Sequence, residues 1–171
     1  MKPEDLGATI YEELRRGLES ETDLSIDDFV KSLDKDSTEL DEQYAGEIMV
    51  GLMFGAVMAI ERSASKHVAE QITSGMKLEF MRHLEEQGAN AIQRAEWEII
   101  LADRFLGYRE ALENYSGFEP PWKLGRQFYW NLIGVEEHIA MLIKICTLYL
   151  LAARDKSQEV LNKYGPLILV H

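Results

Sequence analysis

The chain has 171 residues, of which 46% are hydrophobic and 28% charged, with one cysteine and a net charge of −12. This length and composition are typical of a globular domain large enough to bury its own core. A single cysteine excludes an internal disulfide framework. The negative charge argues against binding of nucleic acid, because the phosphate backbone would be repelled.

The negative charge is concentrated in the first third of the chain. Residues 1–50 hold five Lys/Arg and fifteen Asp/Glu, a net charge of −10, whereas residues 51–171 hold 13 and 15, a net charge of −2. The acidic segment is either a solvated face that maintains solubility or a surface for a basic protein partner. The first residues show no apolar run of a secretory signal, and the cysteine usage suits a reducing compartment, so we expect a cytoplasmic protein.

The predicted elements are all helical. The first helix covers residues 3–19, a short helix is capped by Ser25, and a long helix begins at Thr38 and runs towards Thr73. At Ser74-Gly75 this helix either breaks or continues, since a lone Gly inside a helix costs only about 1 kcal/mol. A segment over residues 76–87 ends at Gly88, which we expect to be a C-cap.

The second half of the chain is also predicted to be helical. A helix over residues 89–115 has an apolar stripe made of Trp97, Leu101, Phe105, Tyr108, Leu112 and Tyr115. A loop precedes Pro121, which begins a last long helix that extends to about Asp155. The elements predict an all-α, up-and-down bundle with four or five long helices in a single domain. It comprises acidic N-terminal helices (1–37), a main bundle (38–164) and an apolar tail (165–171).

A ladder of small residues lies in the most apolar stretch of the chain, Ile48–Ile60. Its members are spaced by four residues and therefore share one stripe of a helix: Gly51, Gly55, Ala59 and Ser63. Small side chains allow another helix to approach closely, which predicts an interface. The stretch has 13 residues, whereas a membrane span needs about 20, so we expect a buried core helix and no membrane partner.

The last long helix is also apolar on nearly every side, with only Glu137 and Lys144 forming a clear polar strip. Surrounding two such helices within 171 residues is difficult. The sequence therefore predicts that part of this surface meets a second copy of the chain in a homodimer. The alternative is that the N-terminal helices and the apolar tail cover both helices within one chain.

One pattern suggests a divalent metal site. The candidate ligands are two His-x-x-Glu pairs and a carboxylate one turn before the second histidine: His67, Glu70, Glu79, His83 and Glu86. If the chain turns back at Ser74-Gly75, the two histidines reach the same level of two antiparallel helices. One continuous helix would instead hold them about 24 Å apart. The Glu-x-x-His order of ferritin-like proteins is absent.

Two other pairs of residues are candidate sites. Arg62 and His67 have a spacing that resembles the Arg-x4-His element of helical HEPN-type ribonucleases, over six residues, which would imply action on RNA phosphate. Glu136 and His138 form either an interhelical bridge or a site, with Arg62, Arg104 and Arg109 as candidate partners. Cys146 lies on an apolar seam, where we expect it to be inert.

No phosphate-binding loop, nucleophile elbow or cysteine-rich zinc pattern is present. We therefore predict a non-enzymatic, self-associating interaction protein, such as an adaptor, regulatory subunit or assembly factor, with no cofactor. The alternative is a metal-binding helical bundle that uses carboxylates and histidines.

Overall fold

The protein is an all-α bundle, as predicted. The computed structural model describes residues 1–19, 29–31, 42–114, 120–134 and 140–165, and this part contains no strand. A helical turn at residues 29–31 lies between the first two of its long helices. These helices are α1 (Pro3–Glu19), α3 (Glu42–Ser63), α4 (Lys66–Glu86), α5 (Ala91–Asn114), α6 (Pro120–Ile133) and α7 (Ala140–Tyr164).

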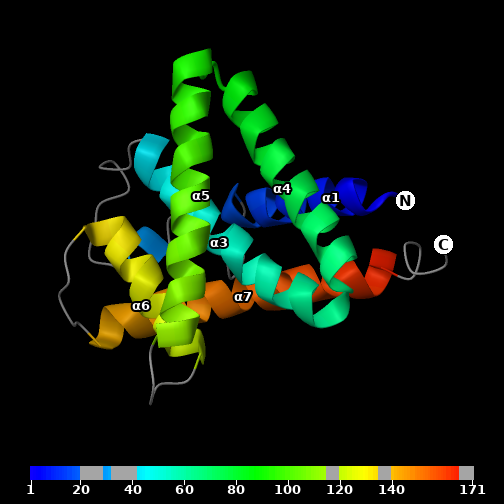
Figure 1. Ribbon diagram of the computed structural model, residues 1–171. Helices are drawn as coiled ribbons and strands as arrows, with labels where there is room; N and C mark the ends of the chain where they lie inside the picture. Colours follow the sequence, from blue (N-terminus) through cyan, green and yellow to red (C-terminus); the bar gives the residue numbers. More distant parts are fainter. Residues whose placement is uncertain (20–28, 32–41, 115–119, 135–139, 166–171) are drawn as a thin grey trace.

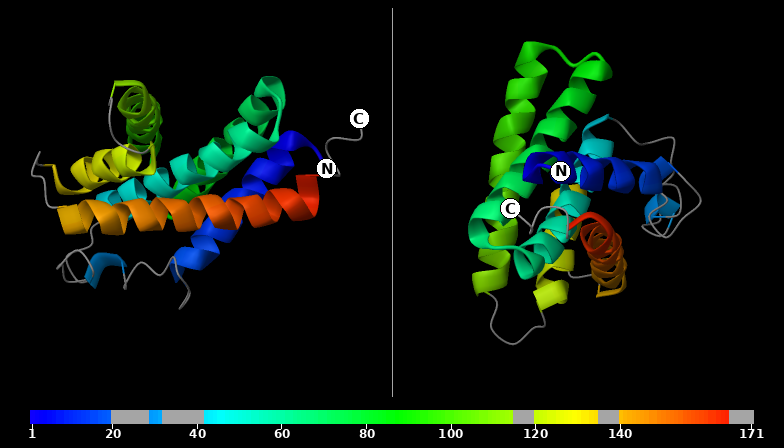
Figure 2. Two further views of the ribbon diagram at one scale, coloured as in Figure 1. Left: turned by 90° about the horizontal axis from the view of Figure 1, so that it is seen from below. Right: turned by 90° about the vertical axis from the view of Figure 1, so that its right-hand side faces the viewer.

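The helices form a packed body from which one hairpin projects. α3, α6 and α7 lie together in the body, and α1 crosses α4 (Figures 1 and 2). α4 and α5 run in opposite directions and meet at a tip formed by residues 87–90, which stands clear of the other helices (Figure 1).

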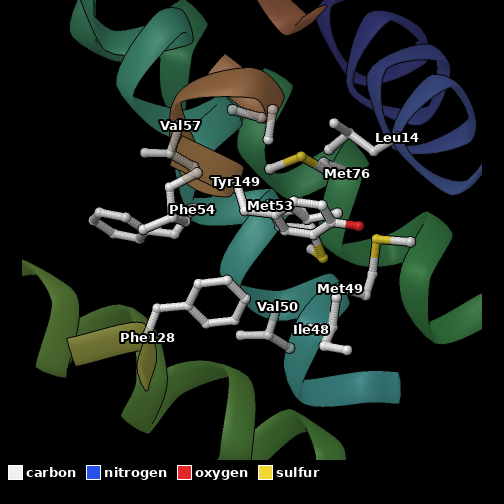
Figure 3. Packing of buried hydrophobic residues seen from close by; sticks show 14 of the residues in the cluster. Leu14, Ile48, Met49, Val50, Met53, Phe54, Val57, Met76, Phe128 and Tyr149 are labelled. Carbon is white, nitrogen blue, oxygen red and sulfur yellow. The ribbon is translucent and has the colours of Figure 1, made fainter. Parts of the chain in front are cut away.

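α3 forms the centre of the core. Side chains on several sides of this helix, including Met49, Val50 and Phe54, point into a cluster with Phe128 of α6 and Tyr149 of α7 (Figure 3). Within the described residues, α3 supplies the one helix that is long and apolar enough to span a membrane, and 72% of that window is buried inside the molecule. The helix that the sequence predicted to need cover on all sides therefore has it within one chain.

The break between α3 and α4 lies ten residues before Ser74-Gly75, where the sequence indicated a possible break. α3 ends at Ser63, and Ser65 takes an extended conformation (φ −62°, ψ 155°) at the N-cap of α4. α4 then continues through Ser74-Gly75 without interruption. The predicted long helix from Thr38 to Thr73 is wrong at this boundary.

Gly75 lies inside α4 at the point where this helix crosses closely over α1. A Cβ at Gly75 would lie 2.1 Å from the carbonyl oxygen of Glu4, and one at Gly7 would lie 2.0 Å from the carbonyl oxygen of Ile72. The two backbones can approach this closely only because neither glycine has a side chain. The glycine marks a packing contact and not a turn.

Two other helix ends involve glycines with positive φ. Gln87 is the C-cap of α4, and Gly88 (φ +95°), the residue predicted as the C-cap, is the left-handed glycine directly after it. Gly134 (φ +74°) follows α6, and its N–H donates to the carbonyl of Trp130 at 2.8 Å. A left-handed glycine is a common helix terminator. The last long helix expected from Pro121 to about Asp155 is therefore two helices, α6 and α7.

Candidate functional site

The residues that the sequence offered as metal ligands all lie along α4, namely His67, Glu70, Glu79, His83 and Glu86. Because α4 is continuous, the sixteen residues from His67 to His83 separate the two histidines by about 24 Å. Arg82 forms ion pairs with both Glu79 and Glu86, and the His83 ring lies 6.2 Å from that of Tyr11. The structure thus does not bring the histidines together. Across its described residues, no group of three or more His, Cys, Asp or Glu is placed to hold a metal ion.

The small-residue ladder is covered by helices of the same chain. A Cβ at Gly51 would lie 2.4 Å from the ring of Phe128 in α6. A Cβ at Gly55 would lie 2.7 Å from the carbonyl oxygen of Leu150 in α7. The glycines therefore admit an aromatic ring and a helix backbone of their own chain, which is a packing role within the fold.

The rest of the ladder behaves similarly. Ala59 is buried, and the exposed Ser63 hydroxyl donates to Oε1 of Gln158 in α7 at 3.2 Å. α3 is covered within its own chain and so gives no support to the predicted homodimer, whereas α7 still has exposed apolar residues. That helix keeps Met141 and Leu148, seven residues apart, 71% and 56% exposed.

The other candidates are not assembled into a site. Arg62 and His67 stand on either side of the break between α3 and α4, and both are exposed. Glu136 and His138 lie outside the described residues. Burial raises the pKa of the Cys146 thiol to about 12, which keeps it protonated and unreactive at neutral pH.

Two of the three arginines that were candidate partners for Glu136, Arg104 and Arg109, form ion pairs that hold α5 to α3. Arg104 donates from Nε to both carboxylate oxygens of the buried Glu47 in α3 at 3.0 Å, and from a terminal nitrogen at 2.7 Å. This hydrogen bonding raises the pKa of the Arg104 guanidinium. Arg109 pairs with Glu61 at 2.6 Å. Sequence reasoning missed this role of Glu47, because nothing local marks a carboxylate at the edge of an apolar helix as buried.

Aromatic packing fixes the inner face of α5. Trp97 packs against Gly46, where a Cβ would be only 2.2 Å from the indole. Phe105 and Tyr108 contact Phe54 of α3, with ring centroids 5.4 and 4.7 Å apart. The predicted apolar stripe of this helix is therefore its buried face where the structure describes it, and the opposite face must point outward.

That outward face carries a second apolar stripe. Ile92, Ile99 and Leu106 are spaced by seven residues and are 72%, 70% and 56% exposed. Ala95 and Ala102, both exposed, lie between them. The alternating spacings of three and four are those of a coiled-coil seam. We call these five residues the α5 stripe, and it is the candidate functional site.

Comparison of the chain with models of protein families, with curated proteins and with solved structures finds no match. We therefore infer function from the physical features of the α5 stripe.

Proposed function

We propose that this chain is a non-catalytic interaction protein, of the adaptor, regulatory-subunit or assembly-factor kind, that binds a partner helix on the α5 stripe. One observation carries the proposal: the exposed apolar residues of α5 recur at the spacing of a coiled-coil seam. Singly scattered apolar residues are ordinary on protein surfaces. A row of them on one face of a projecting hairpin fits a helix-in-groove or helix-on-helix contact.

The composition of the stripe suits close helix packing. The alanines between the larger residues leave holes into which the apolar side chains of a second helix can fit. The inner face of α5 is held by the Glu47–Arg104 pair and by Trp97, so the stripe is presented by a rigid helix. Rigid presentation lowers the entropy lost on binding.

The α5 stripe supplies this chain's share of the apolar binding free energy. Burial of a whole Ile or Leu side chain contributes about 1.5–3 kcal/mol, so burial of the exposed parts of three such residues contributes roughly 3–6 kcal/mol. That corresponds to about 10²- to 10⁴-fold in Kd, from which the cost of association is subtracted. Ile99, at the centre of the stripe, should contribute most.

A neutral probe peptide tests the proposal. It has three heptads with an apolar Leu/Ala seam and Gln at the positions beside the seam, and its binding to the full chain is measured by fluorescence anisotropy. We expect saturable binding that Ile99→Ser weakens about tenfold, since about 1–2 kcal/mol of burial is lost. Leu78→Ser, at a residue of α4 that is 64% exposed, is the matched control and should bind like the parent chain. Absence of binding, or equal loss in both variants, would overturn the proposal.

Two other features remain predictions. A homodimer would have to use a face other than α3, and light scattering of the purified chain would measure it. The cytoplasmic location expected from the sequence can be checked by fractionation of the source cells.

A further inference from the structure

A row of carboxylates accompanies the α5 stripe. Glu96, Asp103 and Glu110 are exposed and are also spaced by seven residues. On an α-helix each lies four residues, or about 40° around the axis, from the stripe residue that precedes it. The carboxylates therefore form a continuous acidic edge along one side of the apolar seam.

The positive charges of α5 offset this edge only in part. Arg94 pairs with Glu85 at 2.7 Å, Arg109 pairs with Glu61, and Arg104 pairs with the buried Glu47. Arg104 also pairs through a terminal nitrogen with Asp103 of the edge itself, at 3.0 Å. All three basic residues of the helix are thus used to hold it to neighbouring segments. The edge has three carboxylates and one guanidinium that is shared with Glu47, so a docking helix would meet a net negative charge.

Charge decides against a second copy of the chain as the occupant. An antiparallel pair centred on Ile99 would place Glu96 opposite Asp103 of the partner subunit. A parallel pair would place Asp103 opposite Glu98 of the partner subunit. Both arrangements put like charges beside the seam, which destabilises a coiled coil. The same edge repels nucleic acid and anionic lipid.

We infer that the α5 stripe binds a basic amphipathic helix of another protein, with Lys or Arg at seven-residue spacing beside its apolar face. This inference depends on the proposed function, because it specifies the occupant of the same surface. The apolar seam supplies the affinity, and the pairing of Lys or Arg with Glu96, Asp103 and Glu110 selects the partner and its register.

Three probe peptides with the same Leu/Ala seam test this inference: one with Gln beside the seam, one with Lys and one with Glu. Binding to the full chain is measured at low salt and at 0.5 M NaCl. We expect the Lys probe to bind about tenfold more tightly than the Gln probe at low salt, and the Glu probe about tenfold more weakly. The differences should shrink at high salt because screening weakens exposed ion pairs.

Charge reversal on the protein supplies the matched test. The triple variant Glu96→Lys, Asp103→Lys, Glu110→Lys should prefer the Glu probe over the Lys probe. Glu70→Lys, at an exposed position of α4, should leave the original order unchanged.

The outcomes separate the two proposals. Binding of the Gln probe that depends on Ile99, without any preference for Lys over Glu, would overturn the basic-partner inference and leave the docking function standing. Failure of all three probes would overturn both. A dimer of the parent chain that Ile99→Ser dissociates would show that a second copy occupies the stripe, and would also overturn the inference.

Discussion

Substitution of Gly75 by alanine tests the α1–α4 crossing most sharply. In an open helical position this change stabilises a protein by about 1 kcal/mol, because alanine favours the helix more than glycine does. Here the new Cβ would lie 2.1 Å from the Glu4 carbonyl oxygen, whereas a relaxed C···O contact is about 3.3 Å. α1 and α4 must therefore separate by about 1 Å.

The loss in free energy of unfolding caused by that separation can be estimated. Overpacking in a core costs about 1–3 kcal/mol, and a contact between two backbones belongs at the upper end because neither can rotate away. After the gain in helix propensity, we expect a net loss of about 2 kcal/mol, or a fall in Tm of about 4–8 °C. Gly107→Ala in α5 is the control: its Cβ would meet only the Gln127 amide at 3.6 Å, so we expect it to be neutral or stabilising.

A double-mutant cycle completes the test. Gly7→Ala adds a side chain to α1 at the same crossing, and its Cβ would lie 2.0 Å from the carbonyl oxygen of Ile72 in α4. Once one substitution has separated the helices, the second should cost less. The double variant should therefore be destabilised by less than the sum of the single variants, by at least about 0.5 kcal/mol in urea titrations. A rise in stability for Gly75→Ala, or strict additivity with Gly7→Ala, would refute the close crossing.

Other predictions concern charge, pH and metal. Glu47→Ala should lower the free energy of unfolding by about 1–3 kcal/mol, because it removes the hydrogen-bonded partner of Arg104. Urea titration measures this change, and an unchanged midpoint of unfolding would contradict the prediction. The folded chain holds the Cys146 proton up to about pH 12, whereas the unfolded chain releases it near pH 9. Below about pH 8 the thiol is protonated in both states, so it does not change the free energy of unfolding with pH. Above pH 9 it lowers the free energy of unfolding by up to about 1.4 kcal/mol per pH unit. Titrations from pH 7 to 11 test the sign, and a rise would contradict it. Since α4 holds His67 and His83 about 24 Å apart, treatment with EDTA should leave the Tm unchanged, and a fall would restore the metal-binding alternative.

Local sequence signals predicted much of the helical framework. The stripe of Leu6, Ile10 and Leu14 after Pro3 predicted α1 with the bounds that the structure has. Gly88 ended α4 as expected. The missed boundary at Ser65 is physically understandable, because neither Ala64 nor Ser65 is a strong helix breaker, whereas Gly75 is a common one. A tertiary contact with α1 keeps Gly75 in the helix, and a sequence does not show which glycines will have such a contact.

The candidate site was harder to predict than the fold. The spacing of Ile92, Ile99 and Leu106 is visible in the sequence, but it competes with the stripe of Leu101, Phe105 and other residues on the opposite face. Periodicity shows that a face is apolar and does not show which face the rest of the chain will cover. For the same reason, the apolar surface of α3 suggested a second chain, although α6 and α7 supply the cover.

Hydrogen exchange of the full chain, with and without a saturating amount of the Lys probe, tests the central claim most directly. If the α5 stripe is the docking surface, added protection of backbone amides should concentrate on residues 92–106, because a bound helix suppresses the opening of α5. Ile99→Ser should abolish that protection and Leu78→Ser should not. Protection centred on α7 or on the acidic N-terminal residues, or no change with the probe bound, would contradict the claim.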